Sequence, residues 1–243
     1  MRLLSPLNNK RVSKIPFCSA VVTAAGKSSR MDGEDKLFAK ICGDPVLAYT
    51  LAIFQECEYV NEIIIVVRED CIEVVSDICS EYRIDKAAKI VIGCLTRLDS
   101  VVNGVYAISE KAELAAIHDG ARPCTDQSIV NRTIEAAAKR HAAAPAVPVT
   151  STLKRVSKGM ISDTIDRAEL YEVQTPQVFT SDLIKAALTN AVVKSIDVTD
   201  DCRAAELIGA TVYITEGSHS NIKLTTSADL YIAEAIIKSR TQA

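Results

Sequence analysis

Short apolar runs that alternate with helical stripes constrain the fold of this chain more than any other feature. The sharpest run is Glu62–Val67, EIIIVV, which is typical of a strand buried on both faces of a sheet. Further strands are predicted at residues 20–22, 89–92, 114–117, 146–149 and 211–215. Strands alternating with helices form βαβ units, so the sequence predicts an α/β fold with a mainly parallel, twisted sheet flanked by helices.

The helical segments show apolar stripes or end signals. Leu47, Leu51 and Phe54 recur at helical spacing after a turn that contains Pro45, and Thr226 begins a capping box. The patterns predict helices near residues 45–54, 71–82, 98–108, 126–141, 181–189, 200–208 and 226–238. Thr125 and Thr199 are the predicted N-caps of two of them. Residues 221–224 are interpreted as a short strand.

Length and composition limit the organisation of the protein. The chain of 243 residues suits a single domain over residues 17–243, preceded by a flexible, basic N-terminal extension at residues 1–16. That extension has no apolar core of a secretory signal, and no apolar run approaches the ~20 residues of a membrane-spanning helix. The net charge of −3 argues against bulk binding to nucleic acid or to a membrane.

The cysteines indicate a reducing compartment. None of the eight is spaced as C-x-x-C, and most fall in apolar patterns, where a free thiol packs as a small hydrophobe. Together with the lack of a secretory signal, this predicts a cytoplasmic protein.

Residues 150–174 break the α/β pattern. Short alternating pieces flank the turn signal Lys158-Gly159, which predicts a β-hairpin with residues 152–156 paired to residues 161–165. An isolated hairpin is only marginally stable in water, so we expect a protruding arm that packs on another surface. The arm favours a homodimer, and the alternative is a hairpin folded back on its own domain.

The strongest functional pattern follows the first predicted strand. Ala24, Ala25 and Gly26 let the backbone approach a ligand closely, and successive N–H groups in such a turn form a concavity for anions. Arg30 and Lys36 then add positive charge. The combination suits a triphosphate, although an ordinary turn with solvated cations is the alternative. The loop matches neither the P-loop motif nor the dinucleotide motif G-x-G-x-x-G.

Three segments are expected to meet at one edge of the sheet. In open parallel sheets, ligands bind beyond the carboxyl ends of the strands. This rule brings together the first loop, residues 93–97 and residues 118–123. Asp119 can ligate Mg²⁺ or bond a ribose hydroxyl, and Arg122 can hold a phosphate. An Asp–Arg pair that closes a tight turn is the alternative.

The first loop resembles the A-[AG]-G-x-x-x-R-M signature of sugar-phosphate nucleotidyltransferases. Over residues 19–237 the chain is further similar to the 2-C-methyl-D-erythritol 4-phosphate cytidylyltransferase family of non-mevalonate isoprenoid synthesis. Nine motifs occur in the order of that family: AAGKSSRM, DK, RLDSV, HDGARP, STLK, TIDR, QTPQVF, TDD and NIKLT. The resemblance implies a Rossmann-like nucleotidyltransferase fold with a β-hairpin arm.

The resemblance also implies a role for each matching residue. The implied catalytic cations are Arg30, Lys36 and Lys223. The implied nucleotide-binding residues are Ala24, Ala25, Gly26, Gly93, Ser100, Asp119 and Gly120, with Asp119 also on the metal. The implied substrate-binding residues are Thr152, Arg167, Thr175, Thr199 and Arg122, of which Thr152 and Arg167 serve the partner subunit's site. Arg122 is further expected to support the turn at Asp119.

The reaction that the resemblance implies is cytidylyl transfer from CTP to the sugar-alcohol phosphate 2-C-methyl-D-erythritol 4-phosphate, with release of pyrophosphate and with Mg²⁺ or another divalent cation. No Cys–His or Ser–His pair at these positions suggests a covalent intermediate, and a charged phosphate needs none. Cys94 stands where the family usually has a second glycine, which affects the turn that recognises the base.

Two other functions remain open at this point. A cytidylyltransferase acting on ribitol 5-phosphate would share the first loop, the turn at Asp119 and the arm. A non-catalytic nucleotide-binding regulator could use the same fold, because fold alone does not determine function. Retention of Arg30, Lys36, Asp119 and Lys223 together favours an enzyme.

Overall fold

A central sheet organises the part of the chain that the computed structural model describes, residues 15–26 and 35–241. Its strands are β1 (Cys18–Ala24), β4 (Glu62–Val67), β5 (Ala87–Ile92), β6 (Leu114–Asp119), β7 (Ala142–Pro148), β10 (Tyr171–Val173), β11 (Gln177–Thr180) and β12 (Tyr213–Glu216). They run in the order β10-β7-β11-β6-β1-β4-β5, with β12 also paired to β7. The predicted α/β class is confirmed.

The middle of the sheet is parallel. β1 pairs in parallel with β4 and β6, and Val21 lies opposite Ile64 on one side and Ile117 on the other. β4 in turn pairs in parallel with β5. The antiparallel strands β10 and β11, which follow the arm, were not predicted. They are only three and four residues long, too short for a clear periodicity.

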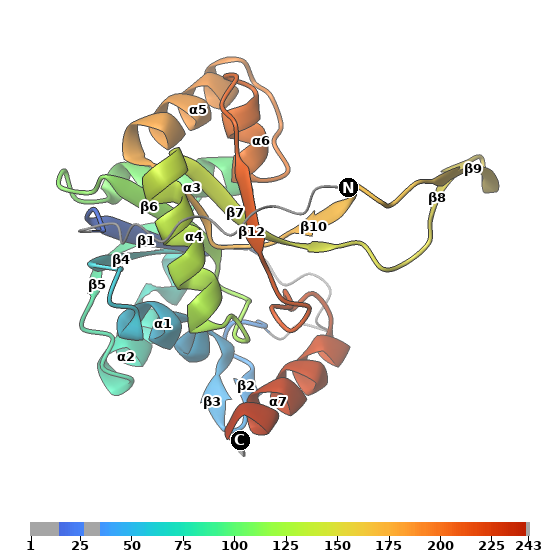
Figure 1. Ribbon diagram of the computed structural model, residues 1–243. Coiled ribbons are helices and arrows are strands. Elements are labelled where there is room, and N and C mark those ends of the chain that lie inside the picture. The colour runs from blue at the N-terminus through green and yellow to red at the C-terminus, as the bar shows by residue number, and fades with distance from the viewer. Residues whose placement is uncertain (1–14, 27–34, 242–243) are drawn as a thin grey trace.

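Helices cover both faces of the sheet (Figure 1). They are α1 (Val46–Glu56), α2 (Ile72–Glu81), α3 (Arg97–Ala107), α4 (Gln127–Arg140), α5 (Ser181–Val193), α6 (Asp201–Glu206) and α7 (Ser227–Thr241), with a 3₁₀ turn, η1, at Glu69–Cys71. Ala20 and Val22 of β1 share a buried cluster with residues of α1, α2 and α4. Val21 faces the other cluster, with residues of α3, α5 and α6. Alternate side chains of one strand therefore enter two cores, which explains its continuous apolar run.

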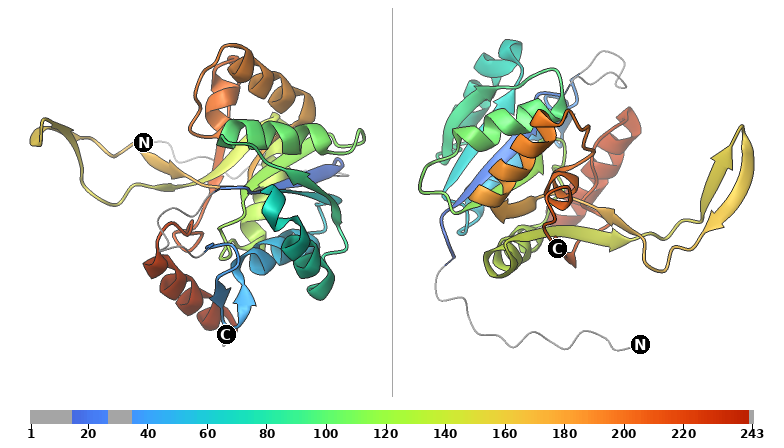
Figure 2. Two further views of the ribbon diagram at one scale, coloured as in Figure 1. Left: turned by 180° about the vertical axis from the view of Figure 1, so that it is seen from behind. Right: turned by 90° about the horizontal axis from the view of Figure 1, so that it is seen from above.

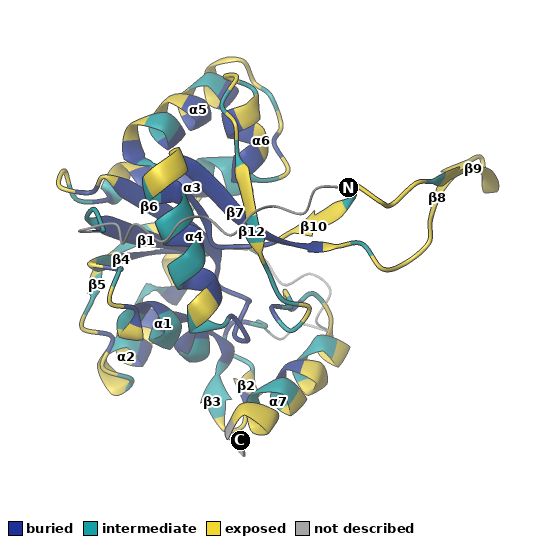
Figure 3. Cartoon of the chain, in the orientation of Figure 1, coloured by how far each residue is buried: buried dark blue, intermediate teal, exposed yellow. Residues whose placement is uncertain are grey.

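The arm projects away from the sheet and is exposed along nearly its whole length (Figures 1, 2 and 3). It consists of β8 (Leu153–Ser157) and β9 (Met160–Ile165), joined by Lys158-Gly159, where both residues have positive φ. The predicted hairpin is confirmed, with strands that extend beyond the predicted pairing at the turn. A second, smaller hairpin joins β2 (Lys40–Ile41) to β3 (Asp44–Pro45) before α1.

Three local predictions were wrong. The N-cap of α4 is Asp126, whose carboxylate accepts from the Ser128 N–H, and not Thr125. The N-cap of α6 is Asp200, which accepts from Arg203 N–H, and not Thr199. In both cases an aspartate next to the threonine takes the cap, and Asp caps at least as well as Thr. Residues 221–224 form a loop rather than a strand.

The predicted N-terminal extension lies almost entirely outside the described residues, and the single-domain organisation stays a prediction. Among the described residues, no helix combines the length and the apolar character needed to cross a membrane.

Candidate active site

A pocket of about 720 Å³ opens at the carboxyl ends of the parallel strands. The three segments that were expected to converge all line it: Thr23 to Gly26 after β1, Gly93 to Arg97 after β5, and Asp119 to Ala121 after β6. Arg68 and Glu69 line it after β4, and Lys36, Leu37, Ser100 and Lys223 complete the wall. The predicted convergence is therefore confirmed. Arg30, the third expected cation, lies outside the described residues.

The backbones of two loops approach each other closely in this pocket. A Cβ atom at Gly93 would lie 2.3 Å from the Ala25 Cβ and 3.0 Å from the Ser100 hydroxyl oxygen. Gly120 is held against the end of β1, where its N–H donates to the Thr23 carbonyl over 2.9 Å. The small residues thus allow three strand ends to meet at one place.

Ser100 shapes the turn that carries Gly93. The buried Ser100 hydroxyl accepts from Cys94 N–H over 2.9 Å and lies 2.9 Å from the Thr96 carbonyl, to which it donates. Thr96 caps α3 by accepting from Asp99 N–H. The exposed Cys94 thiol accepts from Asn103 Nδ2 over 3.3 Å. The turn keeps a defined shape with cysteine in the place where glycine was expected.

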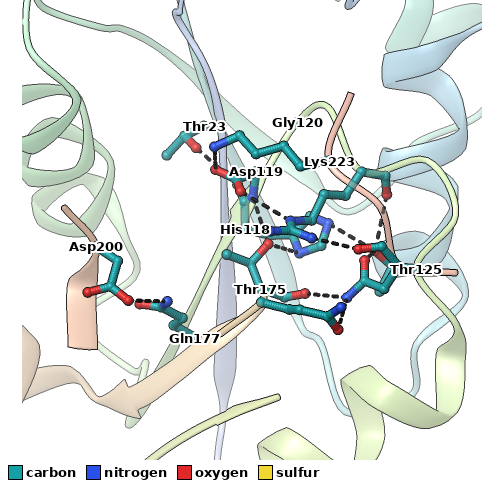
Figure 4. Close-up of polar contacts among 12 residues, drawn as sticks. Thr23, His118, Asp119, Gly120, Thr125, Thr175, Gln177, Asp200 and Lys223 are labelled. Atoms are coloured by element: carbon teal, nitrogen blue, oxygen red, sulfur yellow. Dashed lines mark hydrogen bonds and ion pairs between the residues drawn. The ribbon is translucent and has the colours of Figure 1, made fainter. Parts of the chain in front are cut away.

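Asp119 lies between two cations (Figure 4). Its Oδ1 is 3.1 Å from Lys223 Nζ and its Oδ2 is 3.2 Å from Arg122 Nε. Burial alone would raise the pKa of Asp119, but Lys223, Arg122 and then Arg97 lower it well below its usual range. Asp119 is therefore a fixed negative charge at neutral pH.

Lys36 reaches the same corner of the pocket from the first loop. Its Nζ donates to the Leu224 carbonyl over 3.0 Å, one residue beyond Lys223. Two of the three expected cations are thus brought together from positions far apart in the sequence.

A buried hydrogen-bond network stands behind Asp119, and the sequence analysis missed it (Figure 4). Thr175 Oγ1 accepts from Asp119 N–H over 3.2 Å and lies 3.0 Å from His118 Nδ1, to which it therefore donates. The proton of His118 is then on Nε2, which faces Thr125 Oγ1. Thr125 donates to Asn221 Oδ1 over 2.8 Å. Thr125 Oγ1 also lies 3.1 Å from the Arg122 carbonyl, so both hydroxyls of the network have partners, as buried polar groups require.

Burial keeps His118 neutral. The side chain is fully buried, and burial lowers its pKa to about 3. The positive charges of Arg122 and Lys223 also lower this pKa, whereas the negative charge of Asp119 raises it. The imidazole is thus a structural hydrogen-bonding group rather than a proton carrier at neutral pH.

Arg122 and Thr175 stand behind the pocket wall. Neither belongs to the pocket lining, and both are buried. Arg122 Nη1 donates to the Asn221 carbonyl over 2.6 Å while Nε pairs with Asp119. The geometry favours the expected support of the turn at Asp119 over direct contact with a substrate phosphate.

The remaining expected substrate residues do not line the pocket of their own chain. Thr199 is exposed beside Asp200, the N-cap of α6. Thr152 directly precedes β8 and Arg167 follows β9 by two positions. The arm that these strands form projects away from the sheet (Figures 1 and 2). Arg167 donates to the Thr150 carbonyl. None of the three lines the pocket of its own chain, but Thr199 is tied to the pocket wall, because Asp201, two positions later, pairs with Arg97.

A second ion pair of the site, Arg97–Asp201, was also missed. Arg97 lines the pocket, and its guanidinium binds both carboxylate oxygens of the fully buried Asp201 at 3.0 and 2.7 Å. Arg97 lies in the motif RLDSV and Asp201 lies in the motif TDD, but no local pattern indicated that they pair.

Comparisons with known proteins cover nearly the whole chain. The family model of 2-C-methyl-D-erythritol 4-phosphate cytidylyltransferase matches residues 18–239. A protein of that name from Halalkalibacterium halodurans is 42% identical over 223 residues, covering 91% of this chain and 97% of its own. One from Clostridium botulinum is 41% identical over 225 residues, covering 92% of this chain and 98% of its own. The crystal structure of 4-diphosphocytidyl-2C-methyl-D-erythritol synthase from Anaerococcus prevotii superposes with a TM-score of 0.81 at 32% identity. The superposition covers 92% of this chain and 96% of that one.

Proposed function

The chain belongs to the 2-C-methyl-D-erythritol 4-phosphate cytidylyltransferase family, and we propose that the pocket at its strand ends performs the reaction of that family with the residues described above. The enzyme transfers a cytidylyl group from CTP to 2-C-methyl-D-erythritol 4-phosphate and releases pyrophosphate, a step of isoprenoid precursor synthesis. The observation that carries the proposal for the site is the meeting of Lys36, Asp119 and Lys223 at one pocket.

The nucleotide occupies the pocket between the first loop and the turn before α3. The backbone at Ala24, Ala25 and Gly26 cradles the triphosphate, and Arg30 and Lys36 neutralise its charge. Gly93 and Ser100 shape the cytosine site, while Asp119 and Gly120 face the ribose. The close approach of Gly93 to Ala25 supports this arrangement, because it sets the base-side turn directly against the phosphate loop.

The acceptor phosphate oxygen attacks the α-phosphorus of CTP in line. A new P–O bond forms there as the bond to the β-phosphate oxygen breaks, and pyrophosphate leaves with that bonding pair. Lys223, 41% exposed and directed into the pocket, faces the α-phosphate and lets two anions approach each other. Lys36 stabilises the charge that builds on the leaving pyrophosphate.

Asp119 fits a divalent cation shared with the substrate. No cluster of three or more His, Cys, Asp or Glu side chains suited to a metal occurs in residues 15–26 and 35–241. A single carboxylate is nevertheless enough for Mg²⁺, which completes its shell with water and substrate phosphates. Asp119 has lone pairs left beside its two ion pairs. A bound cation would supply charge neutralisation on the phosphates.

A magnesium titration tests this role. Asp119→Asn should raise the Mg²⁺ concentration needed for the half-maximal rate by at least about tenfold, because a charged ligand becomes a neutral one. Asp77→Asn, an exposed substitution on α2 outside the pocket, is the control. An unchanged magnesium requirement in Asp119→Asn would remove Asp119 from the metal site.

The acceptor site is completed by a second subunit. Thr152 and Arg167 hold the acceptor phosphate from the partner's arm, and Thr199 lies beside it, while Thr175 and Arg122 support Asp119 from behind. The exposure of Val156, Met160 and Ile161 on an arm that projects from its own domain supports a homodimer. The cytosol stays the proposed compartment, and neither nucleic acid nor a membrane is a proposed partner.

Pyrophosphate release tests the activity and the acceptor together. The purified chain is supplied with CTP and Mg²⁺, and with methylerythritol 4-phosphate or ribitol 5-phosphate in parallel reactions. We expect release with methylerythritol 4-phosphate. Release with ribitol 5-phosphate alone would keep the chemistry and change the acceptor. Binding of CTP without release in either reaction would make the chain a nucleotide-binding regulator.

A further inference from the structure

The Arg97–Asp201 pair joins the two halves of the proposed site. The nucleotide half contains the turn from Gly93 to Thr96, and the acceptor half contains Thr199. Arg97 is the first residue of α3, and Asp201 is the first residue of α6, 104 positions later. Both guanidinium nitrogens at the end of Arg97 contact both oxygens of Asp201, so the pair is bidentate and directional. Such a pair sets the relative position of the two helix starts more closely than a single contact would.

The Arg97 end of the pair belongs to the nucleotide half. Arg97 follows the turn from Gly93 to Thr96 directly. Ser100 holds that turn by hydrogen bonds to the Cys94 N–H and the Thr96 carbonyl, and Thr96 caps α3 by accepting from Asp99 N–H. The turn that forms the proposed cytosine site therefore keeps its own hydrogen bonds, and Arg97 is the anchored end of the pair.

The Asp201 end belongs to the acceptor half. Gln177 Oε1 accepts from the N–H groups of Asp201 and Cys202 at 3.0 and 2.9 Å. Gln177 Nε2 donates to Asp200 over 3.0 Å (Figure 4). Thr199 immediately precedes these residues, and Thr175 lies two positions before Gln177. The position of Thr199 thus depends on β11 and on Arg97 at once.

Each residue of the pair offsets the effect of burial on the other's charge. Asp201 is fully buried, and burial raises its pKa while Arg97 opposes the rise. Burial would lower the pKa of Arg97, but Asp201, Asp119 and Asp200 together raise it. Arg97 therefore neutralises a buried carboxylate and also adds to the positive field at Asp119.

We propose that Arg97 and Asp201 are positioning residues that hold the loop carrying Thr199 against the nucleotide half of the pocket, and thereby set the affinity for the acceptor phosphate. The proposal rests on the proposed function of the same pocket. Neither residue needs to touch the acceptor, because the pair holds the loop that carries Thr199 to a turn that its own hydrogen bonds keep in place. An ion pair that serves the fold alone is the competing explanation.

Steady-state kinetics with two variants separate these explanations. Arg97→Lys keeps the positive charge but loses the bidentate geometry, and Asp201→Asn keeps the shape but loses the negative charge. We expect both to raise the KM for methylerythritol 4-phosphate at least about tenfold, since a small displacement of a positioning group is costly. The Kd of CTP, measured by calorimetry without acceptor, should stay within about threefold.

A matched control comes from the same helix. Arg203 pairs with Glu206 on the surface of α6, with both side chains about half exposed, so Arg203→Ala removes an ion pair of α6 without touching the buried one. We expect wild-type kinetics from it. If Asp201→Asn fails to fold, the double variant Arg97→Gln/Asp201→Asn leaves no unpaired buried charge and should show the same rise in acceptor KM.

The outcomes distinguish the inference from the function. A wild-type chain that releases no pyrophosphate with methylerythritol 4-phosphate would contradict the proposed function itself. An active wild type whose variants melt at a lower temperature but keep the acceptor KM would overturn the positioning role. A Kd of CTP that rises as much as the acceptor KM would overturn it too, because the pair would then act on the whole pocket.

Discussion

Single charges at the pocket decide what can bind there. Asp119 holds Lys223 and Arg122 on its two oxygens, so the negative and positive groups fix one another before any substrate arrives. Charged groups that are already oriented need no reorganisation during the reaction, which is the main advantage of such a site.

Lys36→Ala and Lys223→Ala should each lower kcat about a hundred- to a thousand-fold, the usual cost of losing one contact to developing charge. Both side chains line the pocket, and Lys223 remains partly exposed, so the fold should survive either change. Circular dichroism and pyrophosphate release check the two expectations. Lys139→Ala, an exposed substitution on α4, is the control, and turnover near wild type in either pocket variant would exclude that lysine from catalysis.

The buried His118 predicts how stability depends on pH. Its folded-state pKa of about 3 lies below the unfolded value of about 6.5, so the unfolded chain binds an extra proton between these values and stability falls as the pH falls. From pH 7 to pH 5 this one group should cost about 2 kcal/mol of the free energy of unfolding.

Denaturant unfolding at the two pH values measures that cost. His118→Gln should be less stable at pH 7 because the network loses a partner, but its free energy of unfolding should change about 2 kcal/mol less between pH 7 and pH 5. His219→Gln removes an exposed imidazole and is the control for the loss of a histidine. An unchanged pH dependence in His118→Gln would mean that His118 is not kept neutral by the fold.

At the scale of elements, the pocket depends on how closely the ends of β1 and β5 approach. Gly93→Ala would place its Cβ 2.3 Å from the Ala25 Cβ, so one backbone must move. We expect a loss of about 1–3 kcal/mol in the free energy of unfolding, the usual cost of overpacking, together with weaker CTP binding.

Gly26→Ala is the matched comparison for stability. Among residues 15–26 and 35–241, a Cβ at Gly26 would meet nothing within 4 Å, so the free energy of unfolding of Gly26→Ala should stay within about 0.5 kcal/mol of wild type. Equal stability of the two alanine variants would contradict the close approach of the loops.

At the scale of the whole molecule, the proposed site needs two chains. Arg167→Ala disables the arm and Lys223→Ala disables the pocket, so a hybrid dimer of the two variants has one site with neither change. Random mixing makes about half of the dimers hybrid, and activity should recover to about a quarter of wild type. Each variant alone should stay inactive.

Mass measurement of differently tagged chains controls this mixing experiment, because it counts the hybrids directly. Absence of recovery with hybrids present would mean that the arm serves the pocket of its own chain. Met160→Glu, at the exposed tip of the arm, offers a second check: if the arm packs on a partner, light scattering should detect monomers.

Much of the fold could be predicted because its signals are local. The apolar run Glu62–Val67 indicated a doubly buried strand, and β4 has that position at the centre of the parallel part of the sheet. Helix caps were less predictable, since Thr125-Asp126 and Thr199-Asp200 each offer two adjacent caps, and the backbone at the helix start selects one. β11 is a strand of four residues, too short to show a period.

The sequence by itself determined the parallel sheet and the edge at which its polar strand ends meet, because burial periodicity and the order of strands and helices are properties of neighbouring residues. Only the tertiary structure decided which polar groups pair. Thr175 and Arg122 belong behind Asp119, and Arg97 reaches Asp201 across 104 positions. Such pairings depend on how distant helices and strands pack, and no periodicity along the chain records the distance between their side chains.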